Sequence, residues 1–272
     1  MSTNITFYVW GNVSKAFVLS HIFPCGKMEI LERFDDESVI ALIELDKLHD
    51  HEQIKQDHLN ELTEEIKRDK EIKYPLIVDK YSNVVLDGHH RYFALKALGC
   101  KFAPVHIIDY YNPHIKVERW YPVVKTKREV KSVFKALQSE GYSIEQVENE
   151  DVLKVVLDLG QACIGLIVEN SQEEYYIAHK NYCNFQEAMQ IVNKAIEIEG
   201  KRKELDHIGD EKELISMLKS KEARMAIITP LITKEKVVET GATGNPMPPK
   251  STRHILPEKK YYPVSLSDLM PK

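Results

Sequence analysis

The sequence predicts an α/β or α+β fold in two domains, and three observations support this prediction. The chain has 272 residues, 43% of them hydrophobic, which is enough for two modest cores. Short apolar runs typical of strands alternate with longer amphipathic stretches typical of helices. This alternation begins again near residue 125. We therefore expect one domain over residues 1–124 and a second small α/β domain over residues 125–272.

In the first half, residues 53–70 carry apolar side chains about four residues apart, which predicts a helix with one apolar stripe. A second helix is expected over residues 89–98, because Gly99 stands where a left-handed C-cap belongs. The polar loop 46–52 precedes the first of these helices. The strands expected in this half cover residues 38–45, 75–78, 83–86, 104–108 and 117–124.

In the second half, a helix is expected over residues 125–138, and Gly141 lies where it should stop. Residues 241–250 are rich in Gly and Pro, which is typical of a loop or lid. The other helices expected here cover residues 184–197, 210–220 and 234–239, and the strands cover 162–168, 174–178 and 225–229.

The composition bounds the class of protein. The chain has 37 Lys and Arg against 42 Asp and Glu, so its net charge of −5 disfavours a surface built to coat nucleic acid. No apolar run approaches the roughly 20 residues that a membrane helix needs. Thr6 to Trp10 lacks the flanks of a signal peptide and is expected to be a strand. We expect a cytoplasmic protein, monomeric or a small homo-oligomer, without nucleic-acid or membrane partners.

The cysteines do not predict a covalent or metal framework. They are Cys25, Cys100, Cys163 and Cys183, and no two of them have C-x-x-C spacing. We therefore expect neither a zinc site nor disulfides, but buried free thiols. Abundant Lys and Glu with sparse Gln are compatible with life at high temperature.

The clearest chemical signal lies where a predicted strand meets a predicted helix. The strand ends at Asp87, Gly88 permits a tight turn, and His89, His90 and Arg91 occupy the first helical turn. Cations are unfavourable at the positive end of a helix dipole unless an anion binds there, and phosphate is the natural anion. Gly88 would let backbone N–H groups approach it, and Arg91 can hold two oxygens. Alternatively, Asp87 caps the helix and the histidines are solvated.

This segment carries a resemblance to a known superfamily. Asp87 to Tyr92, followed by Ala94-Leu95 and Leu98-Gly99, resembles the signature of ParB/sulfiredoxin-like proteins. His89 stands where sulfiredoxins carry their catalytic Cys, and the Gly-Glu-Arg-Arg box of DNA-segregating ParB proteins is absent. The chain is more similar to the archaeal free L-serine kinases. Three further segments carry that similarity: residues 43–53, Trp120-Tyr121-Pro122 and Thr252-Arg253-His254-x-Leu256-Pro257.

The resemblance implies a ParB/sulfiredoxin-like N-terminal domain, a second small α/β domain whose C-terminal segment returns to the cleft, and an active site in that cleft. It also implies an enzyme that uses ATP or ADP, with Mg²⁺, to phosphorylate L-serine. The product would be O-phospho-L-serine for cysteine biosynthesis. The implied partners are therefore L-serine and an adenine nucleotide.

The resemblance further assigns roles to individual residues. Glu52 is implied to be the general base, a role worth about 10²- to 10⁴-fold in rate. Independently of the resemblance, Asp87 is a carboxylate at a strand end beside the expected phosphates, and such a group could hold Mg²⁺. The implied nucleotide or phosphate ligands are Asp87, Gly88, His89, His90 and Arg91. The implied serine-binding residues are His51, Trp120, Tyr121, Thr252, Arg253 and His254.

Other interpretations stay open at the level of sequence. Glu52 could instead satisfy a helix dipole, or His49-Asp50-His51-Glu52 could form a metal cluster. Trp120 could be a core residue, and Thr252-Arg253-His254 a solvated basic tail. The alternative function is a ParB-like nucleotide-binding regulator or DNA-binding protein without small-molecule catalysis, and a third is a ParB-like nuclease. DNA retention at moderate salt would favour the regulator, because phosphate contacts are salt dependent.

Overall fold

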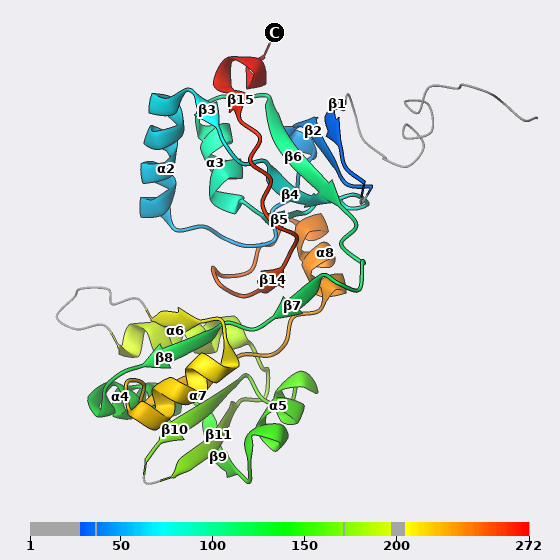
Figure 1. Cartoon of the computed structure of the whole chain (residues 1–272). Helices are drawn as coiled ribbons and strands as arrows, with labels where there is room; N and C mark the ends of the chain where they lie inside the picture. Colours follow the sequence, from blue (N-terminus) through cyan, green and yellow to red (C-terminus); the bar gives the residue numbers. More distant parts are fainter. Residues whose placement is uncertain (1–27, 36, 171, 197–204, 272) are drawn as a thin grey trace, which may run out of the picture. The chain divides into compact units, whose positions relative to one another are not determined.

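A computed structural model describes residues 28–35, 37–170, 172–196 and 205–271 (Figure 1). These residues form two compact units. Unit 1 holds the described residues of Met1–His49, Glu61–Tyr110 and Lys260–Lys272, and unit 2 holds Asp50–Asn60 and Tyr111–Lys259. This division differs from a single split at residue 124, because each unit is built from separate stretches of chain. The predicted strand at Thr6 to Trp10 lies outside the described residues.

Unit 1 is built on a five-stranded sheet in the order β1-β2-β6-β4-β5. Strands β4 and β6 are parallel, and the other neighbours are antiparallel. Nearly every residue of β2, β4 and β6 is buried, as expected for central strands with an apolar sequence. The strands are β1 (Glu29–Arg33), β2 (Val39–Glu44), β4 (Leu76–Asp79), β5 (Val85–Asp87) and β6 (Phe102–Ile108).

The helices and short elements of unit 1 complete its core. Helix α2 (Gln56–Asp69) begins three residues after the predicted start at 53, and the unit boundary falls inside it. Helix α3 (His89–Ala97) ends as predicted, with Gly99 in the left-handed region at φ +76°. The remaining elements are η1 (Leu45–Lys47), β3 (Glu71–Ile72), β15 (Val264–Ser265), which pairs with β3, and η2 (Leu266–Leu269).

A buried carboxylate shapes the hairpin between β4 and β5. The Asp79 Oδ2 atom accepts hydrogen bonds from the Ser82 backbone N–H at 2.8 Å and the Ser82 hydroxyl at 2.7 Å. Its Oδ1 atom accepts one from the Tyr110 backbone N–H at 3.1 Å. Because these donors satisfy a side chain that is fully buried, Asp79 fixes the path by which the chain enters β5.

Unit 2 is a three-layer arrangement around a six-stranded antiparallel sheet in the order β12-β8-β13-β10-β11-β9 (Figure 1). Alternate residues of β10 and β13 contribute to two separate apolar cores, so the cores lie on opposite faces. Helices α4 (Lys127–Ser139) and α6 (Phe185–Ala195) pack in one core, and α5 (Glu150–Asp158) and α7 (Glu211–Ser220) in the other. The strands are β8 (Tyr121–Val124), β9 (Ser143–Val147), β10 (Ile164–Glu169), β11 (Glu173–His179), β12 (Asp206–Ile208) and β13 (Met225–Ile228).

The α/β (α+β) prediction is confirmed, but several boundaries differ. The single strand expected over 117–124 is two strands, because β7 (Lys116–Glu118) pairs with β14 (Arg253–Ile255) whereas β8 joins the large sheet. Helix α8 (Lys234–Thr243) continues past residue 239 into the predicted loop and ends at Gly244, at φ +63°. In the described part of the chain, no helix combines the length and apolar character needed to cross a bilayer.

The expectation of buried free thiols was wrong for two of the cysteines. Cys163, just before β10, and Cys183, just before α6, form a disulfide across 20 residues of sequence. Cys100 is free and buried in unit 1. The pairing could not be read from spacing, because the hairpin of β10 and β11 brings the two positions together only after folding.

Candidate functional site

Residues 86–92, here called the Gly88 turn, join β5 to α3 in unit 1. Gly88 is the N-cap of α3 and has φ +98°, in the left-handed region that favours glycine. A Cβ atom at this position would lie 2.8 Å from both the Arg91 Nη2 atom and the Leu76 Cδ2 atom. The predicted tight turn is therefore present. Its backbone angle favours a glycine, and a side chain here would also have to displace the Arg91 guanidinium and the Leu76 methyl group.

The Arg91 guanidinium is engaged by its own unit. Its Nη1 group donates to the backbone carbonyls of Tyr74 and Pro75, each at 2.7 Å, and its Nη2 group donates to the Asp87 carboxylate. These bonds use three of the five N–H donors of a guanidinium. Burial lowers the Arg91 pKa, and the neighbouring Asp87 carboxylate opposes that shift. Arg91 thus ties the start of β4 to the Gly88 turn.

The other polar residues of the turn remain within reach of solvent. His89 and His90 occupy the first turn of α3, and both are half-buried. The Asp87 side chain is 29% exposed and is paired with Arg91. An oxygen ligand at the start of a helix, with access to solvent, fits the preference of Mg²⁺ for carboxylates and phosphate oxygens. Within the described ranges, no three His, Cys, Asp or Glu residues are grouped to hold a metal ion, so the four-residue metal cluster at 49–52 is not supported.

A second cluster of polar residues lies in unit 2 and is here called the Glu52 cluster. Residues 51–53 run parallel to Met247: its N–H donates to the His51 carbonyl at 2.9 Å, and its carbonyl accepts from the Gln53 N–H at 2.8 Å. This pairing joins the polar loop before α2 to the segment before β14. The members of the cluster are His51, Glu52, Trp120, Lys250, Thr252, Arg253 and His254.

Three donors hold the Glu52 carboxylate. The Lys250 N–H donates to Oε1 at 2.8 Å, and the N–H and hydroxyl of Thr252 donate to Oε2 at 3.3 Å and 3.1 Å. Burial raises the Glu52 pKa above its usual value, and these hydrogen bonds, together with the Lys250 charge, oppose the rise. The result is a carboxylate with a fixed orientation and an increased affinity for a proton.

Thr252 connects Glu52 to the aromatic members of the cluster. Since its hydroxyl donates to Glu52, it accepts from His51 Nε2, which lies 3.2 Å away. Its carbonyl accepts from the Trp120 indole N–H at 2.8 Å. The His51 ring also meets the His254 ring edge-to-face, with centroids 5.3 Å apart. Residues that lie between 132 and 201 positions apart in the sequence therefore form one connected network.

Two cations of the cluster differ in their pairing. Arg253 is opposite Glu118 in the β7–β14 pair and forms an ion pair with it. The Arg253 side chain also packs against Gly209, where a Cβ atom would lie 2.6 Å from its Nε. The Lys250 ammonium lies over the Trp120 ring, 4.2 Å from the centroid, a cation–π contact.

The structure separates the predicted site residues into two groups. Glu52, His51, Trp120 and residues 252–254 are brought together in unit 2, and Asp87 to Arg91 form the Gly88 turn in unit 1. Tyr121 points elsewhere: its side chain is buried in the apolar core beneath α5 and α7. Neighbouring residues at the start of a strand face opposite sides, which separates Tyr121 from Trp120. Lys250 and the Arg253 partner Glu118 were missed, because only the folded β14 segment places Lys250 beside Glu52 and pairs Arg253 with Glu118.

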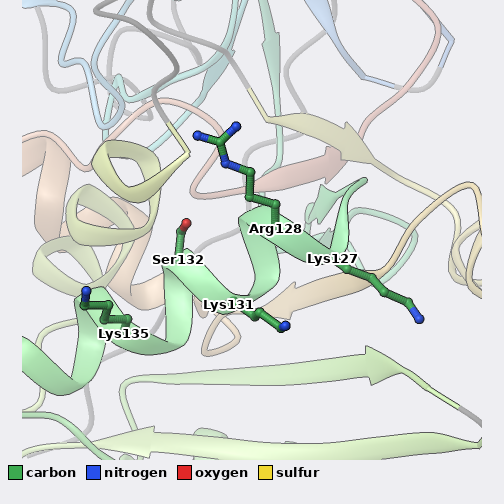
Figure 2. Close-up of a pocket in the computed structure, with 5 residues that line it drawn as sticks. All are labelled: Lys127, Arg128, Lys131, Ser132 and Lys135. Atoms are coloured by element: carbon green, nitrogen blue, oxygen red, sulfur yellow. The ribbon is translucent and has the colours of Figure 1, made fainter.

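A basic groove of about 430 Å³ runs along α4 (Figure 2). It is lined by four cations and one hydroxyl, and all four cations are exposed. A groove that contains no carboxylate among these residues lacks a base for acid–base chemistry, so we place the candidate site at the two clusters above and not here. The lining residues are Lys127, Arg128, Lys131, Ser132 and Lys135.

Comparisons with known proteins find relatives over most of the chain. It is 32% identical over 226 residues to an ATP-dependent L-serine kinase from Staphylothermus marinus, covering 80% of this chain and 85% of that protein. It is 31% identical over 221 residues to an ADP-dependent L-serine kinase from Thermococcus kodakarensis, covering 80% and 87%. A solved free serine kinase in complex with AMP is similar at TM-score 0.68 and 28% identity, covering 91% and 96%. No protein-family model matches the chain.

Proposed function

Because this chain belongs to the free L-serine kinase family, we propose a division of labour among its residues. The protein transfers a phosphoryl group from ATP or ADP to the hydroxyl of L-serine, forming O-phospho-L-serine. In this reaction the serine Oγ–P bond forms, the bond from the transferred phosphorus to the leaving phosphate oxygen breaks, and the hydroxyl proton must leave.

Glu52 is the base that accepts this proton. The supporting observation is the Glu52 carboxylate itself, which Lys250 and Thr252 hold in place and whose pKa is raised by burial. A carboxylate with a raised pKa binds the serine proton more strongly and so favours its transfer. Trp120, His51 and His254 would line the serine site around it.

The Gly88 turn binds the phosphates of the nucleotide in this proposal. The first N–H groups of α3 have no partners within the helix, and the helix dipole favours an anion there. His89 and His90 add donors in the same turn. The Arg91 guanidinium already donates three hydrogen bonds, to Tyr74, Pro75 and Asp87. Its main role in this proposal is therefore to position the turn. Since transfer requires serine and nucleotide to meet, the Gly88 turn and the Glu52 cluster would serve one reaction.

We expect Asp87 to hold Mg²⁺ when the nucleotide is bound. The metal ion would neutralise charge on the phosphates, as in other phosphoryl transfers. Arg91 partly neutralises the Asp87 carboxylate, so Asp87 would share its oxygens between the cation of the protein and the metal. A cytoplasmic location and a role in cysteine biosynthesis are part of the same proposal.

The test is to incubate the protein with Mg²⁺, L-serine and either ATP or ADP, and to measure phosphoserine together with ADP or AMP. Phosphoserine with at least one donor is expected, and none with either would refute the kinase function. Glu52→Gln should lower turnover by about 10²- to 10⁴-fold while nucleotide binding persists. The matched control is Glu235→Gln, at an exposed position on α8. Equal turnover of the two variants would remove Glu52 from the mechanism.

A further inference from the structure

Lys250 has a backbone conformation that a lysine rarely adopts. Its φ is +66°, in the left-handed region that favours glycine. Observed strain of this kind persists where the surrounding structure holds it in place, and it is concentrated at functional sites. Both ends of the residue are used: its N–H donates to Glu52 Oε1 at 2.8 Å, and its ammonium lies 4.2 Å from the Trp120 ring centroid.

Glycine would adopt this positive φ without strain. The presence of a lysine here therefore needs a reason that lies in its side chain. Among the described residues, no carboxylate lies within ion-pair distance of the Lys250 ammonium, and the residue is exposed. Arg253, the other cation of the Glu52 cluster, is already paired with Glu118 and packed against Gly209. Lys250 is thus the cation of the cluster that is available to an incoming anion.

L-Serine brings such an anion. It carries an α-carboxylate a short distance from the hydroxyl that must reach Glu52. We propose that the Lys250 ammonium binds the α-carboxylate of L-serine, an inference that rests on the proposed position of the serine hydroxyl at Glu52. The Trp120 ring beneath the ammonium would hold the lysine stem over the site, and the Lys250 N–H would at the same time orient the base.

Lys250→Gly tests this proposal without disturbing the backbone, because glycine accepts the positive φ and keeps the N–H that binds Glu52. We expect kcat/KM for L-serine to fall about 10- to 100-fold, the value of one charge-assisted contact. The KM of the nucleotide should not change, and Lys250→Arg should recover part of the loss. Lys221→Gly is the matched control, since Lys221 also has a positive φ, +67°, at the end of α7.

The decisive comparison uses L-serinamide, which lacks the carboxylate charge. If Lys250 binds that charge, L-serinamide is a poor substrate for the unmodified protein. Lys250→Gly then lowers kcat/KM for L-serine but leaves kcat/KM for L-serinamide almost unchanged. The proposal would be overturned if Lys250→Gly lowered kcat/KM equally for both substrates. It would also be overturned if the KM of the nucleotide changed while kcat/KM for L-serine did not. Calorimetric titration of the two compounds needs no turnover, so it tests Lys250 even if Glu52 proves not to be the base.

Discussion

Glu52 is the single residue whose charge state matters most for the proposed chemistry. Burial raises its pKa above the usual 4.5, while Lys250 and Thr252 act in the opposite direction. A base must be ionised to accept a proton. On the acidic side of the pH profile, the activity of the enzyme should therefore follow the ionisation of the Glu52 carboxylate.

We predict that kcat/KM for L-serine falls with decreasing pH through a pKa above 4.5, since the folded protein holds the Glu52 proton more tightly than a free side chain does. The sign for stability is opposite to that of an ordinary salt-bridged carboxylate: the contribution of Glu52 to folding increases as pH falls through its folded pKa. A pH profile of kcat/KM checks the prediction, and constant activity down to pH 4.5 would contradict it. In the Lys250→Gly variant the fall of kcat/KM on the acidic side should occur at higher pH, because the variant lacks a cation that lowers the Glu52 pKa.

Single residues also show which features of the site can be predicted from the sequence. Gly88 follows from the sequence, since a strand end, a glycine and a helix start occur in order. The role of Arg91 in fixing the turn does not, because its partners Tyr74 and Pro75 lie just before another strand, β4. Lys250 was not predicted for a related reason: a positive φ at a lysine is set by the surrounding fold, and local sequence rules do not encode it.

At the scale of elements, prediction succeeds where caps and periodicity agree. Helix α4 begins after Thr126, which forms a full capping box with Glu129, and its apolar residues face the core. Helix α5 was missed. It is only nine residues long, and Val155 on its outer face is 56% exposed and Leu159 just beyond it is 66% exposed, so some of its apolar side chains do not mark the buried face. The edge strand β9 was missed as well, because three of its five residues are exposed.

The first turn of α4 carries cations where the helix dipole is positive, and this arrangement should cost stability. We predict that Lys127→Glu stabilises unit 2 by about 0.3–1 kcal/mol through the dipole. Lys135→Glu is the matched control: like Lys127 it is an exposed neighbour of Lys131, but it lies outside the first turn. Thermal or urea unfolding of both variants gives the answer. If Lys127→Glu is no more stable than Lys135→Glu, the dipole does not control this end of the helix.

At the scale of the whole molecule, one covalent bond inside unit 2 was not predicted by spacing rules. The Cys163–Cys183 disulfide encloses the β10–β11 hairpin. Such a loop restricts the unfolded chain more than the folded one. The stability of unit 2 should therefore depend on whether the protein is oxidised.

We predict that reduction, or Cys183→Ser, lowers the Tm of the unit 2 transition by roughly 6–12 °C, from about 3 kcal/mol for a loop of this size. Calorimetry with and without a reductant measures the shift. Cys100→Ser should leave the difference between oxidised and reduced protein unchanged, because Cys100 is free. Identical melting curves under both conditions would show that the bond does not stabilise the unit.

The route of the chain through the two units sets an order for folding on the ribosome. Synthesis runs from the N-terminus, and β15 and η2, which bring Val264 and Leu269 into the core of unit 1, come later in the chain than every residue of unit 2. All residues of unit 2 have been joined by Lys259, before those two are added. The unit that a nascent chain begins first is consequently the one it completes last.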